Sequence, residues 1–297
     1  ALSKGQSLCV GLLVPTLHWP LMLDIVRGVA EGVETSGYAL MLYSMTRGDD
    51  SLRDFTEQIV RARQIDGLLV VIPTSMLDYL SLLYHEGLPM ILVDDRGLKP
   101  GFPSVAPTNF EGGYAAARHL LDTGRRRLGI VNGPVDFGCN RDRIGGFQKA
   151  LDEAGLMLDP RLVRHSDFTE DGGSLMVESL LDGGVEFDGL FFCNDQMALG
   201  GMQRLQQRGV RIPEEVAVVG FDDIPTAKFT TPSLTTIRQP LYEMGHMAAT
   251  LLIESLKGGT LPAESIQLPT SLVVRGSTSG STPLANTSPE LLRQFGS

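Results

Sequence analysis

Residues 8–14 read Leu8-Cys9-Val10-Gly11-Leu12-Leu13-Val14, a nearly unbroken hydrophobic run, and Ile25, Val26, Val29 and Val33 then recur at helical spacing. A strand that is covered on both faces has such a run, whereas a strand with one solvent-facing side alternates apolar with polar residues. The apolar positions that follow indicate one buried face of a helix. The stretch therefore predicts a parallel strand and its covering helix, the repeating unit of a doubly wound α/β fold.

The same unit recurs through most of the chain. Further apolar runs occur at residues 39–43, 67–72, 90–93, 128–131, 190–193 and 216–219. The strings Asp66-Gly67-Leu68-Leu69 and Asp188-Gly189-Leu190-Phe191 stand at equivalent helix-to-strand junctions, which indicates an internal duplication. We therefore expect two α/β lobes, each built on a doubly wound parallel sheet, with ligands bound beyond the carboxyl ends of the strands.

Length and composition fit two globular lobes. The 297 residues are about twice the typical single-domain length of roughly 150. Hydrophobic residues make up 42% and charged residues 20% of the chain, which argues against disorder, and no run approaches the roughly 18 apolar residues of a transmembrane helix. Acidic residues outnumber basic ones 35 to 25, and the net charge of −10 has the wrong sign for gripping phosphates. We expect no appreciable DNA binding by these residues alone.

Cysteine usage and the absence of catalytic motifs narrow the class of protein. Cys9, Cys139 and Cys193 are widely spaced and odd in number, which favours a reducing compartment, so we expect a cytoplasmic protein. The chain contains no glycine-rich phosphate loop, no nucleophile elbow and no paired metal-ligand motif. We therefore expect neither an enzyme nor a bound cofactor or metal.

Polar side chains stand where predicted strands end. Asn194 and Asp195 follow one apolar run, and Asp222 follows the next. Amides and carboxylates hydrogen-bond vicinal hydroxyls, and the guanidinium of Arg143 offers a fork for paired oxygens, which suits a sugar or a similar polyol. Helix capping is the competing interpretation for Asn194, Asp195 and Asp222. Trp19, in the loop after the first strand, either stacks on a sugar face or covers a core.

Seven segments together resemble the effector-binding core of the lactose-repressor (LacI/GalR) family of bacterial transcription regulators. They are Val10–Pro15, Gln64–Leu68, Leu88–Asp94, Arg143–Phe147, Asn194–Gly200, Val218–Asp223 and Leu234–Pro240. Each segment alone is weakly specific, but all seven occur in the order found in the family. The resemblance extends from Ala1 to about Thr278.

The resemblance implies a periplasmic-binding-protein-like fold of type I, with two lobes joined by three crossovers and an effector bound in the cleft between them. The implied boundaries are a hinge-helix tail in 1–7, an N-terminal lobe in 8–122 and 239–262, a C-terminal lobe in 123–238 and 263–277, and a flexible tail in 278–297.

The resemblance also implies which residues contact the effector. Arg143, Asn194 and Asp222 match family positions that bind it, and they are the residues that the strand ends had already singled out. The implied further contacts are Arg47 after the second strand, Trp19, Leu21 and Met22 around the start of the first helix, and Glu111, where the family more often has aspartate or asparagine.

The function implied is the effector-sensing and dimerisation core of a DNA-binding transcriptional regulator, which we expect to be a homodimeric repressor controlled by a sugar or sugar derivative. Family members reach operator DNA through an N-terminal headpiece and a hinge helix. We expect this chain to begin at the end of that helix, with Leu2 at the position of the leucine that wedges between base steps. A periplasmic sugar-binding protein of a transporter is the alternative. No contact with a membrane is expected.

Overall fold

The computed structural model describes residues 7–45, 50, 54–72, 77–95, 97 and 101–279. The chain divides into two compact units. Unit 1 comprises residues 1–115, 134–149 and 238–271, and unit 2 comprises residues 116–133, 150–237 and 272–297. The chain forms two six-stranded sheets, so the prediction of two α/β lobes with parallel sheets is confirmed.

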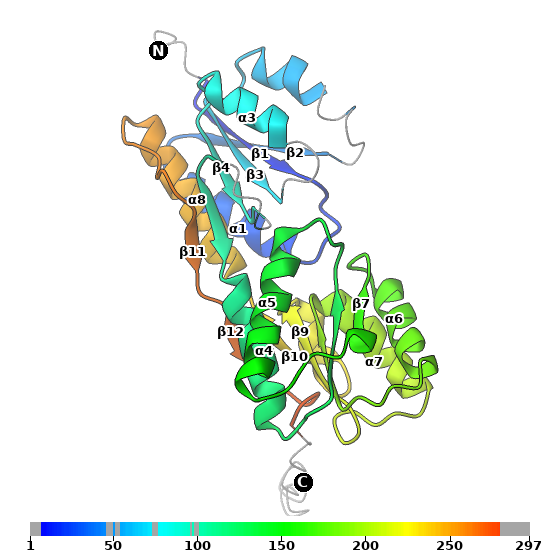
Figure 1. Cartoon of the computed structure of the whole chain (residues 1–297). Helices are drawn as coiled ribbons and strands as arrows, with labels where there is room; N and C mark the ends of the chain where they lie inside the picture. Colours follow the sequence, from blue (N-terminus) through cyan, green and yellow to red (C-terminus); the bar gives the residue numbers. More distant parts are fainter. Residues whose placement is uncertain are drawn as a thin grey trace, which may run out of the picture. The chain divides into compact units, whose positions relative to one another are not determined.

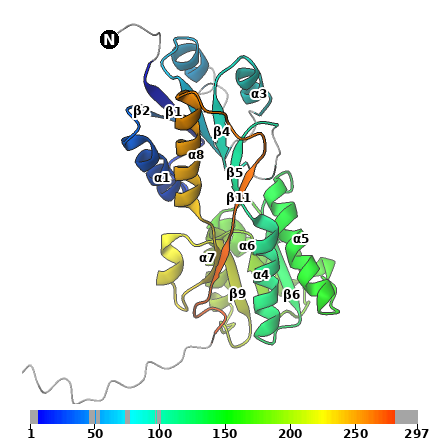
Figure 2. The same ribbon diagram turned by 90° about the vertical axis from the view of Figure 1, so that its left-hand side faces the viewer.

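The first sheet has the strand order β11-β5-β4-β3-β1-β2. Its strands are β1 (Cys9–Val14), β2 (Ala39–Ser44), β3 (Gly67–Val71), β4 (Met90–Val93), β5 (Ser104–Pro107) and β11 (Ile266–Leu268). All of these pairings are parallel, and Figure 2 shows β11, from late in the chain, beside β5. Helices α1 (Met22–Glu34) and α8 (Leu241–Leu256) pack on each other, and α8 lies against β3, β4 and β5 (Figure 1).

The second sheet has the order β12-β10-β9-β8-β6-β7. Its strands are β6 (Leu128–Asn132), β7 (Val163–His165), β8 (Gly189–Phe192), β9 (Ala217–Asp222), β10 (Thr235–Arg238) and β12 (Ser271–Val273). Helices α6 (Glu170–Asp182) and α7 (Asp195–Gln207) pack together, and α7 contacts β8 and β9. The chain passes from one sheet to the other three times, ahead of β6, β11 and β12, as the resemblance implies.

The central strands β1, β3, β4 and β5 of the first sheet are buried on both faces, whereas the edge strands β2 and β11 are partly exposed. Val10, Leu12 and Val14 of β1 belong to one hydrophobic cluster with residues of α1 and α8. Leu13, between them in sequence, belongs to a second cluster that includes Leu80 of α3 (Leu77–His85). Side chains that alternate along a strand thus meet an apolar layer on either side, which is why the run contains no polar residue.

A carboxylate with the same role in both halves supports the duplication. Asp66, just ahead of β3, accepts hydrogen bonds from the backbone N–H groups of Ser7 and Leu8 (2.9 and 2.8 Å), which lead into β1. Asp188, just ahead of β8, accepts from the N–H groups of Arg126 and Arg127 (3.0 and 2.9 Å), which lead into β6. Each carboxylate ties the entrances of two neighbouring parallel strands together.

Glycines let helices α4 (Asn109–Asp122) and α5 (Gly138–Glu153) approach closely. A Cβ on Gly146 of α5 would lie 1.9 Å from the carbonyl oxygen of Phe110, and a Cβ on Gly113 of α4 would lie 2.0 Å from the carbonyl oxygen of Arg143. Backbone cannot yield at such distances, so both positions need glycine. The contact fixes Arg143 against the first turns of α4.

A buried carboxylate joins the start of α7 to the strands beside it. Asp195 is fully buried; its Oδ2 accepts from the N–H of Ile224 (2.9 Å) and its Oδ1 accepts from the hydroxyl of Thr236 (2.6 Å). A Cβ on Gly220 of β9 would lie 2.2 Å from Asp195 Oδ1, so glycine makes room for the carboxylate. Burial, reinforced by the nearby carboxylate of Asp222, raises the pKa of Asp195 well above its usual value.

Among the described residues, no helix combines the length and the apolar composition that crossing a membrane requires.

Neighbouring glycines of α5 provide a test of the helix contact. Gly146→Ala should lower the free energy of unfolding by about 1–3 kcal/mol, because its methyl group overlaps backbone. Gly145→Ala should leave stability unchanged or raise it by about 0.5–1 kcal/mol, since alanine favours helices and the nearest atoms are 3.5 Å away in the Phe110 ring. Urea denaturation measures both; equal losses would contradict the close contact.

The raised pKa of Asp195 predicts a pH dependence of stability. Because the native state holds this proton more tightly than the unfolded chain, stability should fall as the pH rises from about 4, where the unfolded carboxyl ionises, through the raised pKa of the folded protein. Asp195→Asn keeps a neutral side chain that can donate to Thr236 and accept from Ile224, so its stability should lack this decline. Thermal midpoints between pH 4 and 8 test the difference, and parallel curves would refute it.

Candidate functional site

Among the described non-glycine residues with positive φ, most lie where strands end at their carboxyl side. These are Ile72 (47°) after β3, Asp94 (59°) after β4, Phe168 (68°) after β7, and Asp222 (116°) and Asp223 (61°) at the end of β9, whereas Leu8 (52°) and Arg63 (51°) lie ahead of β1 and β3. Left-handed backbone is costly for these residue types and persists where the surroundings enforce it, commonly at binding sites. The backbone therefore points to the same sheet edges as the sequence.

The Asn194 side chain caps a helix, which was one of the two interpretations of its sequence position, and it also holds a loop. Its Oδ1 caps α7 by accepting from the N–H of Met197 (3.0 Å), and its Nδ2 donates to the carbonyl oxygen of Phe168 (2.9 Å). The side chain is 7% exposed, so the capping interpretation is confirmed. The second hydrogen bond holds the loop that carries Phe168 against the carboxyl end of β8.

Phe168 is a candidate site residue that sequence reasoning missed. Its ring lies on Gly133, where a Cβ would be 2.2 Å from Phe168 Cζ, and its backbone is held by Asn194. Asp167 fixes the loop by accepting from the N–H and the hydroxyl of Thr169 (3.1 and 2.7 Å), and the hydroxyl bond leads the interactions that lower the pKa of Asp167. An aromatic residue next to an Asp-x-Thr turn after a strand was the available signal.

Three aspartates of unit 2 share one region but differ in role. Asp195 is structural, as described above. Asp223 pairs with Arg275, whose Nη2 lies 2.6 Å from Asp223 Oδ1. Asp222 is 5% exposed and adopts the strained φ of 116° at the end of β9. Asp222 is therefore the carboxylate best placed to serve a ligand at this edge.

In unit 1, Arg143 of α5 donates from Nε to Asn109 Oδ1 (2.8 Å), and both side chains are buried. Asn109, the first residue of α4, was not among the predicted site residues, although it stands two positions before Glu111. Glu111 itself is exposed in the first turn of α4. The pair holds the Arg143 guanidinium in one orientation, which a fork that binds paired oxygens requires.

The predicted contacts around the first helix lie on and in the core of unit 1. Trp19 and Leu21 are partly buried and pack against the cluster formed with α1 and α8, whereas Met22 is 1% exposed within it. The structure thus shows the core contact of Trp19 that was one of its two interpretations. Arg47 and Leu2 lie outside the described residues.

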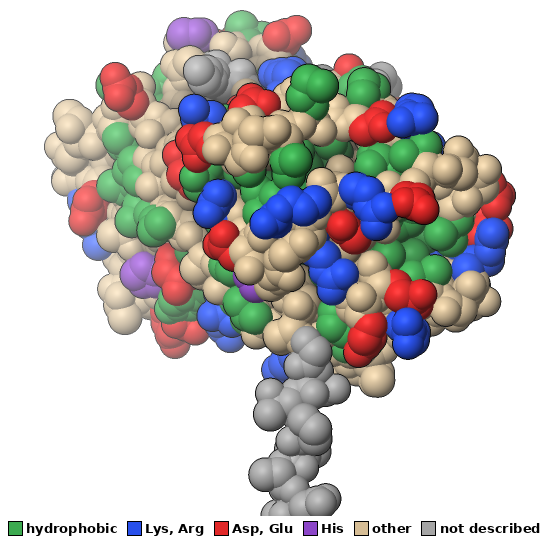
Figure 3. Space-filling view, turned by 60° about the horizontal axis from the view of Figure 1, so that its bottom comes forward, with side chains coloured by type: hydrophobic (Ala, Val, Ile, Leu, Met, Phe, Trp, Pro, Cys, Tyr) green, Lys and Arg blue, Asp and Glu red, His purple; other side chains and the backbone are tan. Residues whose placement is uncertain are grey.

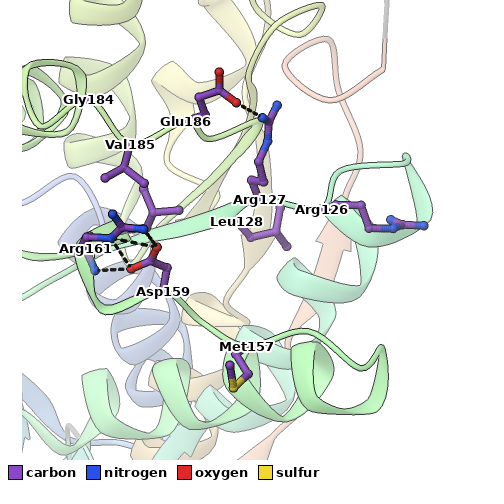
Figure 4. A pocket seen from close by; sticks show the side chains of 10 residues that line it. Arg126, Arg127, Leu128, Met157, Asp159, Arg161, Gly184, Val185 and Glu186 are labelled. Carbon is purple, nitrogen blue, oxygen red and sulfur yellow. Dashed lines mark hydrogen bonds and ion pairs between the residues drawn. The ribbon is translucent and has the colours of Figure 1, made fainter.

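A second type of feature, a surface cavity of about 380 Å³, lies at the opposite end of the second sheet, by the start of β6 (Figure 4). Two ion pairs line it: Arg161 pairs with Asp159 at 2.7 Å, and Arg127 pairs with Glu186. Within the described ranges, no group of three or more His, Cys, Asp or Glu side chains could hold a metal ion. The strand carboxyl ends remain the candidate ligand site.

The face drawn in Figure 3 shows Lys and Arg side chains interspersed with Asp and Glu. A surface of mixed sign does not provide the continuous positive field that attracts the phosphate backbone of a nucleic acid. This face therefore agrees with the expectation from net charge.

Comparison with known proteins finds similarity to a domain family, to sequences of transcriptional repressors and to structures of transcriptional regulators. Residues 117–278 match the family model of a periplasmic binding protein-like domain. The repressor PurR of Haemophilus influenzae is 32% identical over 256 residues, which cover 86% of this chain and 76% of PurR. The structure of the transcriptional regulator CelR with cellobiose aligns with a TM-score of 0.84 and 30% identity over 92% of this chain and 85% of CelR.

A LacI-family transcriptional regulator from Enterococcus faecium with bound ribose aligns with a TM-score of 0.79 and 29% identity, covering 91% of this chain and 98% of its own. These relatives regulate transcription, which supports the regulator over a transporter's periplasmic receptor. The shared sequence, the two parallel sheets and their three connections show that the chain belongs to the LacI family of transcriptional regulators, whose effector-binding core it contains.

Proposed function

We propose that this core binds a sugar or sugar derivative at the carboxyl ends of its strands and thereby controls the operator affinity of a repressor. The observation that carries the proposal is the grouping of Phe168, Asn194 and Asp222 at one edge of the second sheet. The Arg143–Asn109 pair of unit 1 adds a buried, oriented guanidinium.

The chemistry of these groups fits a polyol. A sugar presents apolar C–H faces, which stack on aromatic rings, and hydroxyls, which both donate and accept hydrogen bonds. Phe168 supplies the ring, Asp222 an acceptor and Arg143 a fork of donors. Two of the structural relatives hold cellobiose and ribose, which supports the same ligand class here.

The remaining predicted effector contacts differ in how exposed their side chains are. Trp19 and Leu21 line the outside of the unit 1 core and could still offer apolar surface, whereas Met22 is buried and would act by fixing the start of α1. Glu111 is exposed and would contribute through its charge. Arg47 stays a prediction from the resemblance.

Regulation would follow from linkage between two binding equilibria. A ligand that prefers one arrangement of the two units shifts the population toward it, and the operator affinity of a dimer changes by the same coupling free energy. A homodimer suits two half-sites, and we place the regulator in the cytoplasm, where operator DNA is found. The absence of a nucleophile elbow or phosphate loop supports binding without catalysis.

Ligand binding should depend on the strand-end residues. For a sugar that raises the thermal midpoint of the wild-type protein, Asp222→Ala and Arg143→Ala should each weaken binding by roughly 10-fold or more, since buried charge-assisted hydrogen bonds are lost. Phe168→Leu should weaken it by roughly 2- to 10-fold through loss of stacking. Isothermal titration calorimetry gives the affinities.

Arg161→Ala is the matched control for Arg143→Ala, because Arg161 lies in the charged cavity at the other end of the second sheet. It should bind the sugar as the wild type does. Ligand-free thermal midpoints identify any variant that fails to fold. Unchanged affinity in all three strand-end variants would place the site elsewhere.

Control of transcription is tested on the whole regulator that contains this chain. An electrophoretic mobility shift with DNA from upstream of its own gene, at one stated salt concentration, should show an operator affinity that changes by roughly 5- to 150-fold when the sugar is added. Asp222→Ala in the same protein should abolish the response. A sugar that binds the core without altering operator affinity would exclude regulation by that ligand.

A further inference from the structure

Asn132, the last residue of β6, has a buried amide group that the protein does not use. The residue is 3% exposed, and its Oδ1 is buried without a hydrogen-bond partner. Within the described part of the chain, its side chain makes no hydrogen bond at all. A buried acceptor that is left unsatisfied destabilises the fold, so such groups are rare without a functional reason.

Three other residues with a buried polar atom that lacks a partner are anchored through another atom of the same group. Arg125 donates from Nη2 to the carbonyl oxygen of Pro213, and Glu178 accepts at Oε1 from Arg208 Nη1. Asn140 donates from Nδ2 to the carbonyl oxygen of Pro134 (2.7 Å). Asn132 differs from all of these because neither end of its amide is held by the described chain.

The backbone places Asn132 beside the segments of the proposed site. Its carbonyl oxygen accepts from the N–H of Ser166 (2.9 Å), in the loop that leads to Phe168, and the next residue, Gly133, lies beneath the Phe168 ring. On the neighbouring strand, Cys193 donates its N–H to Val131 (2.9 Å), which brings the start of α7 alongside. Asn132 therefore ends its strand between the segments that carry Phe168 and Asn194.

We propose that Asn132 is a specificity-determining residue of the effector site, whose Oδ1 accepts a hydrogen bond from one ligand hydroxyl. This inference rests on the proposed function and deepens it. A site that reserves a buried acceptor rejects a ligand that lacks the matching donor, because the acceptor then stays unpaired in the complex. The effector is thus a polyol with a free hydroxyl at one fixed position, and the corresponding deoxy sugar is discriminated against.

The test compares affinities in a variant-by-ligand cycle. D-Ribose, D-glucose and cellobiose are titrated into the wild-type protein, followed by each monodeoxy analogue of the one that binds. Asn132→Ala should weaken the parent sugar by roughly 10-fold. For one deoxy analogue, wild type and Asn132→Ala should bind with equal affinity, because the partner of Asn132 is already missing.

Asn132→Leu separates binding from folding. This side chain has a similar size and no polar atom, so the ligand-free thermal midpoint should stay the same or rise by roughly 2–4 °C while sugar affinity is lost. Gln206→Ala removes another amide of unit 2, one that donates to Thr231 O from the last turns of α7, and should leave affinity unchanged.

The outcomes distinguish this inference from the proposed function. The inference is overturned if Asp222→Ala weakens the sugar while Asn132→Ala binds it like the wild type, or if the loss from Asn132→Ala is the same for every deoxy analogue. It is also overturned if Asn132→Leu lowers the thermal midpoint with affinity intact. If no sugar binds the wild type, or if Asp222→Ala and Phe168→Leu leave the sugar affinity unchanged, the proposed function is wrong, and so is the inference that rests on it.

Discussion

Burial of parallel strands on both faces is the constraint on which the rest of this structure depends. In β1, Val10 and Leu13 enter different apolar clusters, so no position within the strand can carry a polar side chain without desolvating it. Many of the polar groups consequently lie at the strand ends, where helices begin and backbone N–H groups need acceptors. Side chains that can hydrogen-bond a ligand are therefore found at the edges of the sheets, because the buried middle of a strand such as β1 is apolar.

The two ends of the strands use their polar groups differently. At the amino ends, the carboxylates of Asp66 and Asp188 accept hydrogen bonds from backbone N–H groups that lead into neighbouring strands, and so they stabilise the fold. At the carboxyl ends the backbone adopts positive φ at Asp94 and Asp222, a conformation that these residues adopt at a cost. The carboxylates at the amino ends thus stabilise the fold, while the carboxyl ends also hold strained residues and one buried amide oxygen without a hydrogen-bond partner, groups that a ligand can contact.

Sequence patterns predicted the fold because its cause is local. Unbroken apolar runs and helical spacing identify strands and helices directly, and the Asp-Gly-Leu echo identified a duplication that shared hydrogen bonding later explained. The site was predicted less completely. Asn194 and Asp222 stand beside strands in sequence, whereas Phe168 and Asn109 depend on how loops and helices fold back, on contacts such as Phe168 with Gly133 that no spacing rule contains.

Neighbouring polar residues show why the residue type alone could not predict whether a side chain stabilises the fold or serves a ligand. Asn194 and Asp195 follow the same strand, yet Asp195 turns inward to Ile224 and Thr236, and Asn194 caps its helix while it holds Phe168. The side chain of Asn132, the last residue of the neighbouring strand β6, makes no hydrogen bond within the described chain. Since the three side chains have nearly the same size, their different roles follow from the partners that each one finds. An amide left without any is the group that a ligand can use at no cost to the fold.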